Sequence, residues 1–228
     1  MTTIMIQAPG VSTLGEFFHA GGSLMWPIFG CSVVVAGLAI ERYLSLRKSR
    51  VLPSSVSEAV EQIEKGNVDA VAGALASEPS AGLRVLAAGV RRRGFALADV
   101  EKAMEDALAN ESARMRGNVR GIVLMASVSP LLGLLGTVLG IAEAFAAVEQ
   151  TGLGKSESSE ALASGIKVAL YTTIFGLFVA IPATLVAAHL QARARRLAAA
   201  IAFAVAPAIE ALAPRPTSPT STGDVHAA

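Results

Sequence analysis

One uncharged stretch, residues 121–142, constrains the fold of this 228-residue chain more than any other feature. Its 22 residues suffice to cross a bilayer as a helix, because about 20 residues at about 1.5 Å each span the hydrocarbon core. Small, hydroxyl-bearing and proline residues interrupt the stretch, namely Ser127, Ser129, Pro130, Gly133, Gly136, Thr137 and Gly140. Glycines at this density predict close packing against other helices, and the hydroxyls indicate that one face meets a polar group.

Two other uncharged runs, residues 23–40 and 168–190, are also long enough to cross a membrane. The mean hydropathy of +0.55 and the hydrophobic fraction of 53% are high for a soluble domain. We therefore predict an all-α integral membrane protein with three transmembrane helices, at residues 23–40, 121–147 and 165–190.

The first of these helices carries the only cysteine of the chain, Cys31. Residues 28–31 faintly resemble a lipoprotein cleavage box. A cleaved leader needs a basic front, however, and residues 1–22 contain one acid and no base. We therefore interpret Cys31 as a small buried apolar residue and the helix as an uncleaved membrane helix.

Residues 41–120 differ in composition, since they hold 13 of the 19 basic and 11 of the 18 acidic residues. Helical spacing of their apolar residues predicts a helical region outside the membrane. We expect a helix that opens with the capping-box spacing of Ser55–Glu58, a short helix at residues 69–76, and a helix at residues 82–93 that Gly94 stops.

A further helix is expected to begin with Asp99 as its cap and to run without a break into the membrane, because no proline occurs before Pro130. The basic triplet Arg91–Arg93 is either a site for lipid headgroups or a partner or, as we favour, a solvated face beside the membrane. The third uncharged run continues as a helix through residues 191–213. The Pro-, Ser- and Thr-rich residues 214–228 are predicted to be disordered.

The distribution of basic residues predicts the topology. Seventeen of the 19 bases lie in residues 41–120 and 191–228, which the positive-inside rule places in the cytoplasm. Residues 1–22 and the short link 148–164 are then periplasmic. The second and third membrane helices are expected to extend into the cytoplasm.

Two threonines fall at a common predicted depth. Thr137 is ten residues from Ala147, and Thr173 is nine residues from Ser164, so both lie about 14–15 Å below the outer edge. Pro130 and Pro182 match in the same way, at 17 and 18 residues. The hydroxyls either bond within and between helices, as packing groups, or line a polar pathway, and the sequence leaves both interpretations open.

No side chain in the membrane runs titrates near neutral pH: residues 23–40, 121–142 and 168–188 hold no Asp, Glu, Lys, Arg or His. A proton relay normally needs an ionisable group at depth. Either the chain does not conduct, or another subunit supplies the carboxylate. The sequence predicts no cofactor and no metal, the net charge of +1 gives no argument for nucleic acid, and no motif indicates an enzyme.

Two segments carry a family resemblance. The segment Pro130–Gly140 followed by Phe145, and the segment Ala169–Ala183, resemble the second- and third-helix signatures of the ExbB/TolQ/MotA proton-channel superfamily. Glu41–Tyr43, at the end of the first helix, is similar to the family's opening. With the three-helix topology, the resemblance covers nearly the whole chain.

The resemblance implies a ring of five copies around single-span partners of the ExbD/TolR kind, in the inner membrane and in contact with its lipids. A partner aspartate would carry the proton, and a TonB- or TolA-like protein would receive the work. Thr137 and Thr173, with Thr172 beside them, match the proton-pathway threonines. Gly133, Gly136, Gly140 and Gly176 would serve helix packing, and Pro130 and Pro182 would introduce kinks.

One position departs from the family pattern. Many ExbB and TolQ proteins carry a glutamate in a Gly-Ile-x-Glu-Ala-Leu segment, where this chain has Val168. The departure leaves room for a paralogue that serves another machine than nutrient uptake or outer-membrane maintenance. The competing interpretation is a non-conducting membrane scaffold, and a membrane-anchored regulatory protein is disfavoured because residues 41–120 carry no ligand motif.

Overall fold

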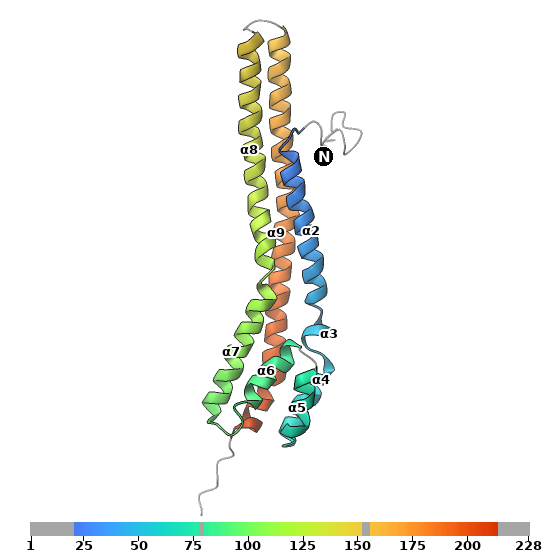
Figure 1. The fold of residues 1–228 in the computed structure, drawn as a ribbon, viewed down its shortest axis with the longest axis vertical. Helices are drawn as coiled ribbons and strands as arrows, with labels where there is room; N and C mark the ends of the chain where they lie inside the picture. Colours follow the sequence, from blue (N-terminus) through green and yellow to red (C-terminus); the bar gives the residue numbers. More distant parts are fainter. Residues whose placement is uncertain (1–20, 78–79, 152–155, 214–228) are drawn as a thin grey trace, which may run out of the picture. The chain divides into compact units, whose positions relative to one another are not determined.

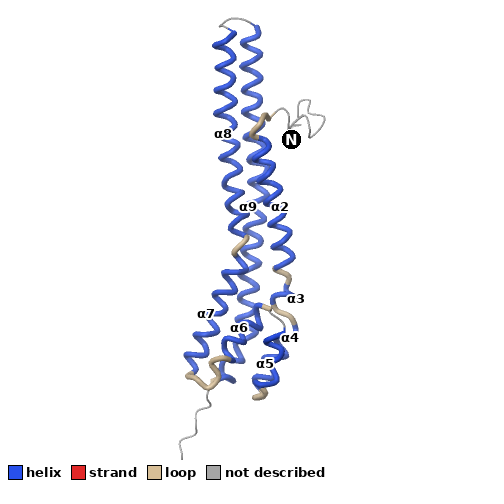
Figure 2. Tube along the Cα trace, in the orientation of Figure 1, coloured by secondary structure: helices blue, strands red, loops and turns tan. Residues whose placement is uncertain are grey.

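The structure is a computed structural model that describes residues 21–77, 80–151 and 156–213. All regular structure in these ranges is helical, as predicted (Figures 1 and 2). The helices are α2 (Met25–Ser45), α3 (Lys48–Val51), α4 (Ser54–Glu64), α5 (Val68–Ser77), α6 (Ala81–Val90), α7 (Leu97–Arg116), α8 (Val119–Thr151) and α9 (Ser156–Leu212). The predicted periplasmic N-terminus up to residue 20 and the predicted disordered tail lie outside the described residues.

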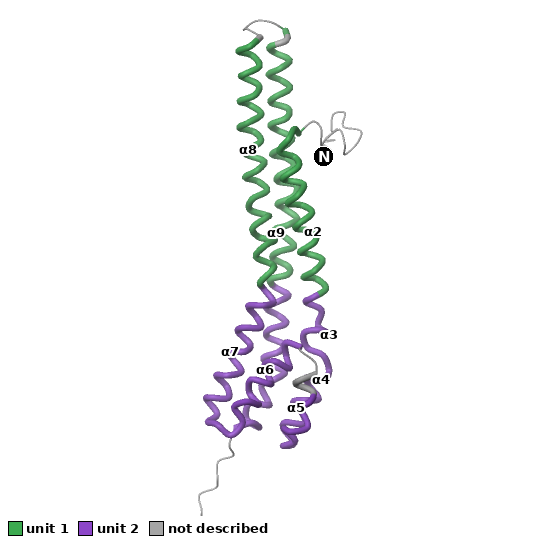
Figure 3. The backbone as a smooth tube through the Cα atoms, viewed as in Figure 1, with its two compact units in different colours: residues 1–44, 117–191 green, residues 45–116, 192–228 purple. Residues whose placement is uncertain are grey.

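Three segments are long and apolar enough to cross a membrane: Met25–Ser45, a part of Leu97–Gln150, and a part of Ser158–Leu212. The prediction of three candidate spans is therefore confirmed. The chain divides into two compact units (Figure 3). One unit comprises residues 1–44 and 117–191, and the other comprises residues 45–116 and 192–228.

In the first unit, α8 and the first part of α9 run antiparallel and in direct contact, because Gly133 lies against Gly176 and Gly140 lies against Gly165. Helix α2 packs beside this pair, where Leu38 approaches Gly121. Met25 and Ile28 of α2 are buried, whereas most of its other apolar side chains are exposed. An apolar outer surface of this kind suits a helix that contacts lipid or neighbouring subunits.

The second unit has a conventional apolar core, in which Val56 and Ile63 of α4, Leu83 and Leu86 of α6, and Ile201 of α9 are buried. At one end of this unit, the backbone of Gly94 contacts the last residue of α9. The Gly94 φ of 83° is a left-handed conformation that favours glycine, and its backbone N–H donates to the carbonyl oxygen of Leu212 at 3.1 Å. The last turn of α9 therefore has a partner for one of its free carbonyls.

One prediction about the helices is wrong. The expected uninterrupted helix from Asp99 into the membrane is two helices, since α7 ends at Arg116 and α8 begins at Val119. Gly117 and Asn118 form a turn between them. Both residue types have low helix propensity, so their adjacency breaks the helix without a proline.

Two capping predictions are also wrong. Helix α4 begins at Ser54 after Pro53, so Ser55 lies inside the helix and the expected capping box does not form. Helix α7 begins at Leu97, which places Asp99 in the first turn and not at the cap. A carboxylate in the first turn still faces the positive end of the helix dipole.

Candidate functional site

A stripe of small residues forms the contact between α8 and α9. The buried members are Ser129, Gly133, Gly136, Gly140 and Ala144 on α8, and Ala169, Thr172, Gly176, Ala180 and Ala183 on α9. Steps of three and four residues keep each set on one helix face. Small side chains on both faces let the two backbones approach closely, as in membrane helix pairs.

The backbones approach so closely that a side chain would not fit at several of these glycines. A Cβ atom on Gly176 would lie 2.7 Å from the carbonyl oxygen of Ser129. A Cβ atom on Gly133 would lie 3.0 Å from the carbonyl oxygen of Thr172, and one on Gly140 would lie 3.2 Å from that of Gly165. Backbone atoms cannot move aside as the end of a side chain can, so a Cβ on Gly176 would force the helices apart, and one on Gly133 or Gly140 would require a shift of a few tenths of an ångström.

The three threonines use their hydroxyl hydrogens in different ways. Thr173 Oγ1 donates across the helix pair to the carbonyl oxygen of Gly133, at 3.1 Å. Thr137 Oγ1 donates within its own helix to the carbonyl oxygen of Leu134, at 2.6 Å. Thr172 Oγ1 donates to the carbonyl oxygen of Ala169, at 2.8 Å.

The threonines also differ in burial. Thr172 is 1% exposed, because its side chain lies against Gly136 inside the helix contact. Thr137 and Thr173 are half-buried. A molecule beside the helix pair therefore reaches Thr137 and Thr173, whereas Thr172 is covered within the pair.

The predicted common depth of Thr137 and Thr173 is wrong by about one helical turn. The hydrogen bond to Gly133 places Thr173 level with that residue, four residues or about 6 Å below Thr137. The count failed because α8 continues to Thr151 and α9 starts at Ser156, so the assumed helix ends at Ala147 and Ser164 were wrong.

The predicted match of the two prolines fails for the same reason. Gly176 lies against Ser129, so Pro130 and Pro182 are about seven residues, or about 10 Å, apart in depth. Both prolines lie inside continuous helices, Pro130 in α8 and Pro182 in α9. Proline has no N–H, so each removes one helix hydrogen bond at its own level.

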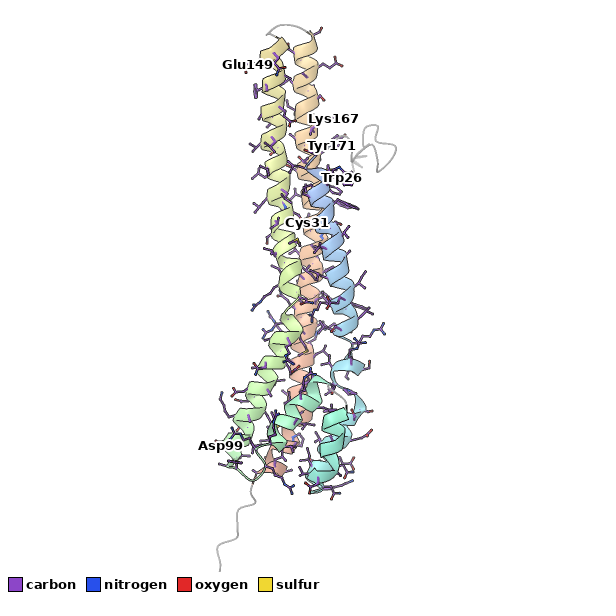
Figure 4. All side chains as sticks on the ribbon, viewed as in Figure 1. Trp26, Cys31, Asp99, Glu149, Lys167 and Tyr171 are labelled. Carbon is purple, nitrogen blue, oxygen red and sulfur yellow. The ribbon has the colours of Figure 1, made fainter. Side chains whose placement is uncertain are left out.

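Charged side chains occur at the end of the pair that carries the α8–α9 link, where Figure 4 labels Glu149 and Lys167. The Lys167 ammonium lies 5.8 Å from the centroid of the Tyr171 ring, within the range of a cation–π contact. Val168, at the position of the family glutamate, lies on the side of α9 that faces the start of α2, where a Cβ on Gly22 would meet it at 3.4 Å.

The second unit contains an ion pair that the sequence did not predict, between a buried carboxylate and an arginine whose side chain is 40% exposed. Arg84 Nε and Nη2 donate to the two carboxylate oxygens of Glu111, at 2.8 and 2.6 Å, and Arg114 adds a longer bond at 3.4 Å. Glu111 is buried at 6% exposure, and its hydrogen bonds raise the pKa of the Arg84 guanidinium. The pair fastens α6 to α7. No sequence spacing indicated it, because 27 residues separate the partners.

Gly165 is a second residue that the sequence analysis did not single out, although its spacing in the sequence indicates its role in the helix contact. A Cβ atom on Gly165 would lie 2.8 Å from the carbonyl oxygen of Gly140. Its spacing of four from Ala169 and eleven from Gly176 continues the small-residue stripe toward the start of α9.

In the part of the chain that the structure describes, no group of three or more His, Cys, Asp or Glu side chains forms a metal site.

Comparison with known proteins finds one matching family and several similar relatives. Residues 78–202 match the model of the MotA/TolQ/ExbB proton channel family. A putative biopolymer transport protein ExbB homolog of Methanothermobacter thermautotrophicus is 33% identical over 171 residues, which cover 74% of this chain and 60% of that relative.

Two further relatives are also similar to this chain. The biopolymer transport protein exbB1 of Vibrio cholerae is 32% identical over 172 residues, covering 71% of this chain and 72% of its own length. The Tol-Pal system protein TolQ of Haemophilus influenzae is 39% identical over 92 residues, covering 40% of this chain and 39% of its own length.

Proposed function

Because the chain belongs to the MotA/TolQ/ExbB proton channel family, we propose that it is the channel subunit of a motor of the ExbB–ExbD or TolQ–TolR type, driven by the proton motive force. Members of this family are channel or motor subunits of membranes, not enzymes. The family and the three apolar helices support a multi-pass protein of the bacterial inner membrane.

The observation that carries the proposal is the pair of reachable hydroxyls, on Thr137 and Thr173, in a membrane unit whose uncharged runs hold no acid. Both hydroxyl hydrogens are donated to backbone carbonyls, at Leu134 and Gly133. Each oxygen then offers only lone pairs to a third group. Such oxygens can only accept a hydrogen bond. A protonated carboxylic acid can donate one, whereas a carboxylate cannot.

This preference gives the two threonines a defined role. They stabilise a partner's aspartic acid in its protonated form while it passes Thr137 and, about 6 Å deeper, Thr173. Once the proton leaves, the carboxylate needs donors, so it either turns the hydroxyls away from Leu134 and Gly133 or moves to water. The site therefore couples the protonation of the partner to its position.

The proposed assembly is a ring, with five copies whose α8 and α9 surround the single-span partner. Large apolar side chains on these helices remain exposed in a single chain, among them Leu134, Leu170 and Phe178, and need lipid or a neighbouring subunit. The proposed orientation has the N-terminus in the periplasm, and residues 41–120 and the C-terminus in the cytoplasm, on the side of most basic residues.

The names of the relatives support two systems, biopolymer transport and Tol-Pal. We propose that work is delivered across the periplasm to a TonB- or TolA-like protein. A non-conducting scaffold is the second candidate, and one observation favours it: each of the hydroxyls of Thr137, Thr172 and Thr173 already has a hydrogen-bond partner within the helix pair.

Proton flux through a reconstituted complex separates the two functions. The chain is co-expressed with its single-span partner, purified and placed in vesicles that contain a pH-sensitive dye, and a potassium diffusion potential is applied. We expect acidification only when both proteins are present and the partner retains its membrane aspartate. An intact complex without flux would contradict the channel and favour the scaffold.

A further inference from the structure

Three side chains near the start of α2 are of the kinds that favour the edge of a bilayer. Trp26 of α2 is 69% exposed, Lys167 of α9 is exposed, and Tyr171 of α9 is partly buried. The Lys167 ammonium lies 5.8 Å from the centroid of the Tyr171 ring. Tryptophan, tyrosine and lysine combine an apolar body with a polar tip, so they concentrate where hydrocarbon meets headgroups.

The register of α2 against α9 fixes the levels of side chains on the two helices. Gly22, just before α2, lies against Val168 of α9, where an added Cβ would meet the valine at 3.4 Å. Near the other end of α2, Tyr43 and His189 line the same groove between the helices. Each α9 residue comes 146 positions after its α2 neighbour, so the helices run parallel and keep one register along the span.

This register places Trp26 level with Tyr171 to within one residue, and Lys167 one turn closer to the link between α8 and α9. Figure 4 shows the three residues at neighbouring levels, with Glu149 well beyond them toward the link. Tyr171 is three residues after Val168, so it lies on the side of α9 that faces α2. The two aromatic rings and the ammonium therefore form one band of the membrane unit.

A second band, of Tyr43 and His189, lies about one bilayer thickness away. Tyr43 is 52% exposed and comes 17 residues after Trp26 on α2, and the exposed His189 comes 18 residues after Tyr171 on α9. Both separations are about 26–27 Å along the helix, and the hydrocarbon core is about 30 Å thick. Between the bands, residues 27–40 of α2 and 172–188 of α9 carry no charge. The two bands therefore have the spacing of the two edges of a membrane.

The ends of α8 and α9 continue beyond the first band. Helix α9 begins at Ser156, 11 residues or about 16 Å before Lys167, and α8 runs beside it to the link. Exposed carboxylates occur along these ends, at Glu143, Glu149 and Glu160. An ionised carboxylate is unfavourable in hydrocarbon, so this part of the pair suits water and not lipid.

We propose that Trp26, Lys167 and Tyr171 form a binding surface for the headgroups of anionic phospholipids. The Lys167 ammonium pairs with a lipid phosphate, and the two aromatic rings lie among the headgroup and glycerol atoms, next to the acyl chains. The outer edge of the bilayer is then at the level of Lys167 and not at Ala147 and Ser164, and the ends of α8 and α9 stand in the periplasm. The assignment of this leaflet to the periplasmic side rests on the orientation in the proposed function.

Trp26 is the only tryptophan of the chain, so its fluorescence reports its depth directly. The full chain is placed in vesicles of phosphatidylcholine and phosphatidylglycerol that contain lipids spin-labelled either at the headgroup or in the middle of the acyl chain. The control is the double variant Trp26→Phe, Val34→Trp, because Val34 is 46% exposed and eight residues, or about 12 Å, further along α2.

We expect the headgroup label to quench Trp26 more strongly than the acyl label does, and the acyl label to quench the control more strongly. Stronger quenching of Trp26 by the acyl label would place it inside the hydrocarbon and overturn the proposal. Absence of quenching by either label would also overturn it, because a neighbouring protein surface would then cover Trp26.

A second measurement tests the contact between the Lys167 ammonium and the lipid phosphate. Brominated phosphatidylglycerol and brominated phosphatidylcholine are compared as quenchers of Trp26, in the parent chain and in Lys167→Gln. From the energy of one cation at an anionic membrane surface, we expect the preference for phosphatidylglycerol to fall about fivefold in Lys167→Gln. Lys102→Gln, at an exposed position of α7 in the second unit, is the control and should keep the parent preference. An unchanged preference in Lys167→Gln would overturn the headgroup contact.

Thiol labelling tests the position of the outer edge. In a Cys31→Ala background, Ala142→Cys on α8 and Ala163→Cys on α9 are exposed positions beyond Lys167, whereas Leu170→Cys, at a residue 58% exposed, is on the membrane side of it. The reagent is a membrane-impermeant maleimide. The thiolate reacts, and an apolar environment that raises a thiol pKa by one unit lowers the thiolate fraction about tenfold. We therefore expect the first two variants to react about tenfold faster than the third.

Equal rates at the three positions would show that hydrocarbon covers the ends of α8 and α9, and would overturn the proposed edge. Neither the quenching nor the labelling depends on proton flux. Failure of these measurements would therefore leave the channel function intact, and absent flux in the parent complex would leave the lipid-binding surface intact.

Discussion

Thr173 Oγ1 and the carbonyl oxygen of Gly133 are 3.1 Å apart, and their hydrogen bond joins α9 to α8 halfway along the small-residue stripe. One hydroxyl therefore belongs both to the packing of the helix pair and to the surface that a molecule beside it can reach. Two functions in one group make the choice of substitution important, because a variant that disturbs packing says little about the pathway.

The first prediction concerns that hydroxyl. Thr173→Val keeps the branched shape and removes one hydrogen bond, which costs about 1 kcal/mol in the stability of the pair. A barrier higher by about 1.4 kcal/mol slows a rate tenfold, so a loss of about 1 kcal/mol in the pathway lowers proton flux about fivefold, and we expect this fall while the complex still assembles. Thr173→Ser is the control and should retain most of the flux. Parent flux in Thr173→Val would remove the residue from the pathway.

The second prediction concerns the glycines of the helix contact. Gly176→Ala places a Cβ 2.7 Å from the backbone oxygen of Ser129, so the helices must separate. Overpacking of this kind costs about 1–3 kcal/mol. Gly37→Ala in α2 is the control, because no atom lies within 4 Å of its added Cβ and alanine favours helix.

Thermal unfolding of the purified full chain measures both variants. We expect Gly176→Ala to lower Tm and Gly37→Ala to leave it unchanged or raise it. A similar Tm for the two variants would show that the α8–α9 contact does not require glycine at this position.

The helices and spans could be predicted from the sequence because hydropathy and helical spacing are local properties. The 22 uncharged residues of 121–142 need no knowledge of their neighbours to be recognised as a span. The break at Gly117–Asn118 was missed although both residues are weak helix formers, because proline was taken as the only breaker. Residues of low helix propensity other than proline break or continue a helix according to the contacts around them.

The depth of the candidate site could not be predicted, because it depends on where two helices end. The link between α8 and α9 has no charge pattern that marks Thr151 and Ser156 as the last and first helical residues. An error of one turn at those ends moved Thr173 relative to Thr137 by about 6 Å.

The third prediction concerns the ion pair between α6 and α7. Arg84→Met removes the two short bonds to Glu111, which stays buried with the longer bond from Arg114 alone. A buried carboxylate without its partner costs about 1–3 kcal/mol or more. We expect a lower Tm for the full chain, with normal helix content by circular dichroism.

The double variant Arg84→Met, Glu111→Leu, with the two single variants, forms a double-mutant cycle that measures the interaction of this pair. Replacing both charges by apolar groups removes the buried carboxylate as well, so we expect the double variant to be more stable than Arg84→Met alone. Additive losses of stability would indicate that the two side chains do not interact, and would contradict the bidentate geometry.

The fourth prediction concerns the end of the second unit. Gly94 has a φ of 83°, and its N–H donates to the carbonyl oxygen of Leu212, the last residue of α9. Alanine in this conformation costs about 1–2 kcal/mol, whereas asparagine adopts it more readily. We therefore expect Gly94→Ala to lower Tm more than Gly94→Asn. The same strain should loosen the bond to Leu212, so hydrogen exchange at the Gly94 amide should accelerate in Gly94→Ala. Equal Tm values for Ala and Asn would mean that the loop relaxes to an ordinary conformation and that its geometry is not required to hold the end of α9.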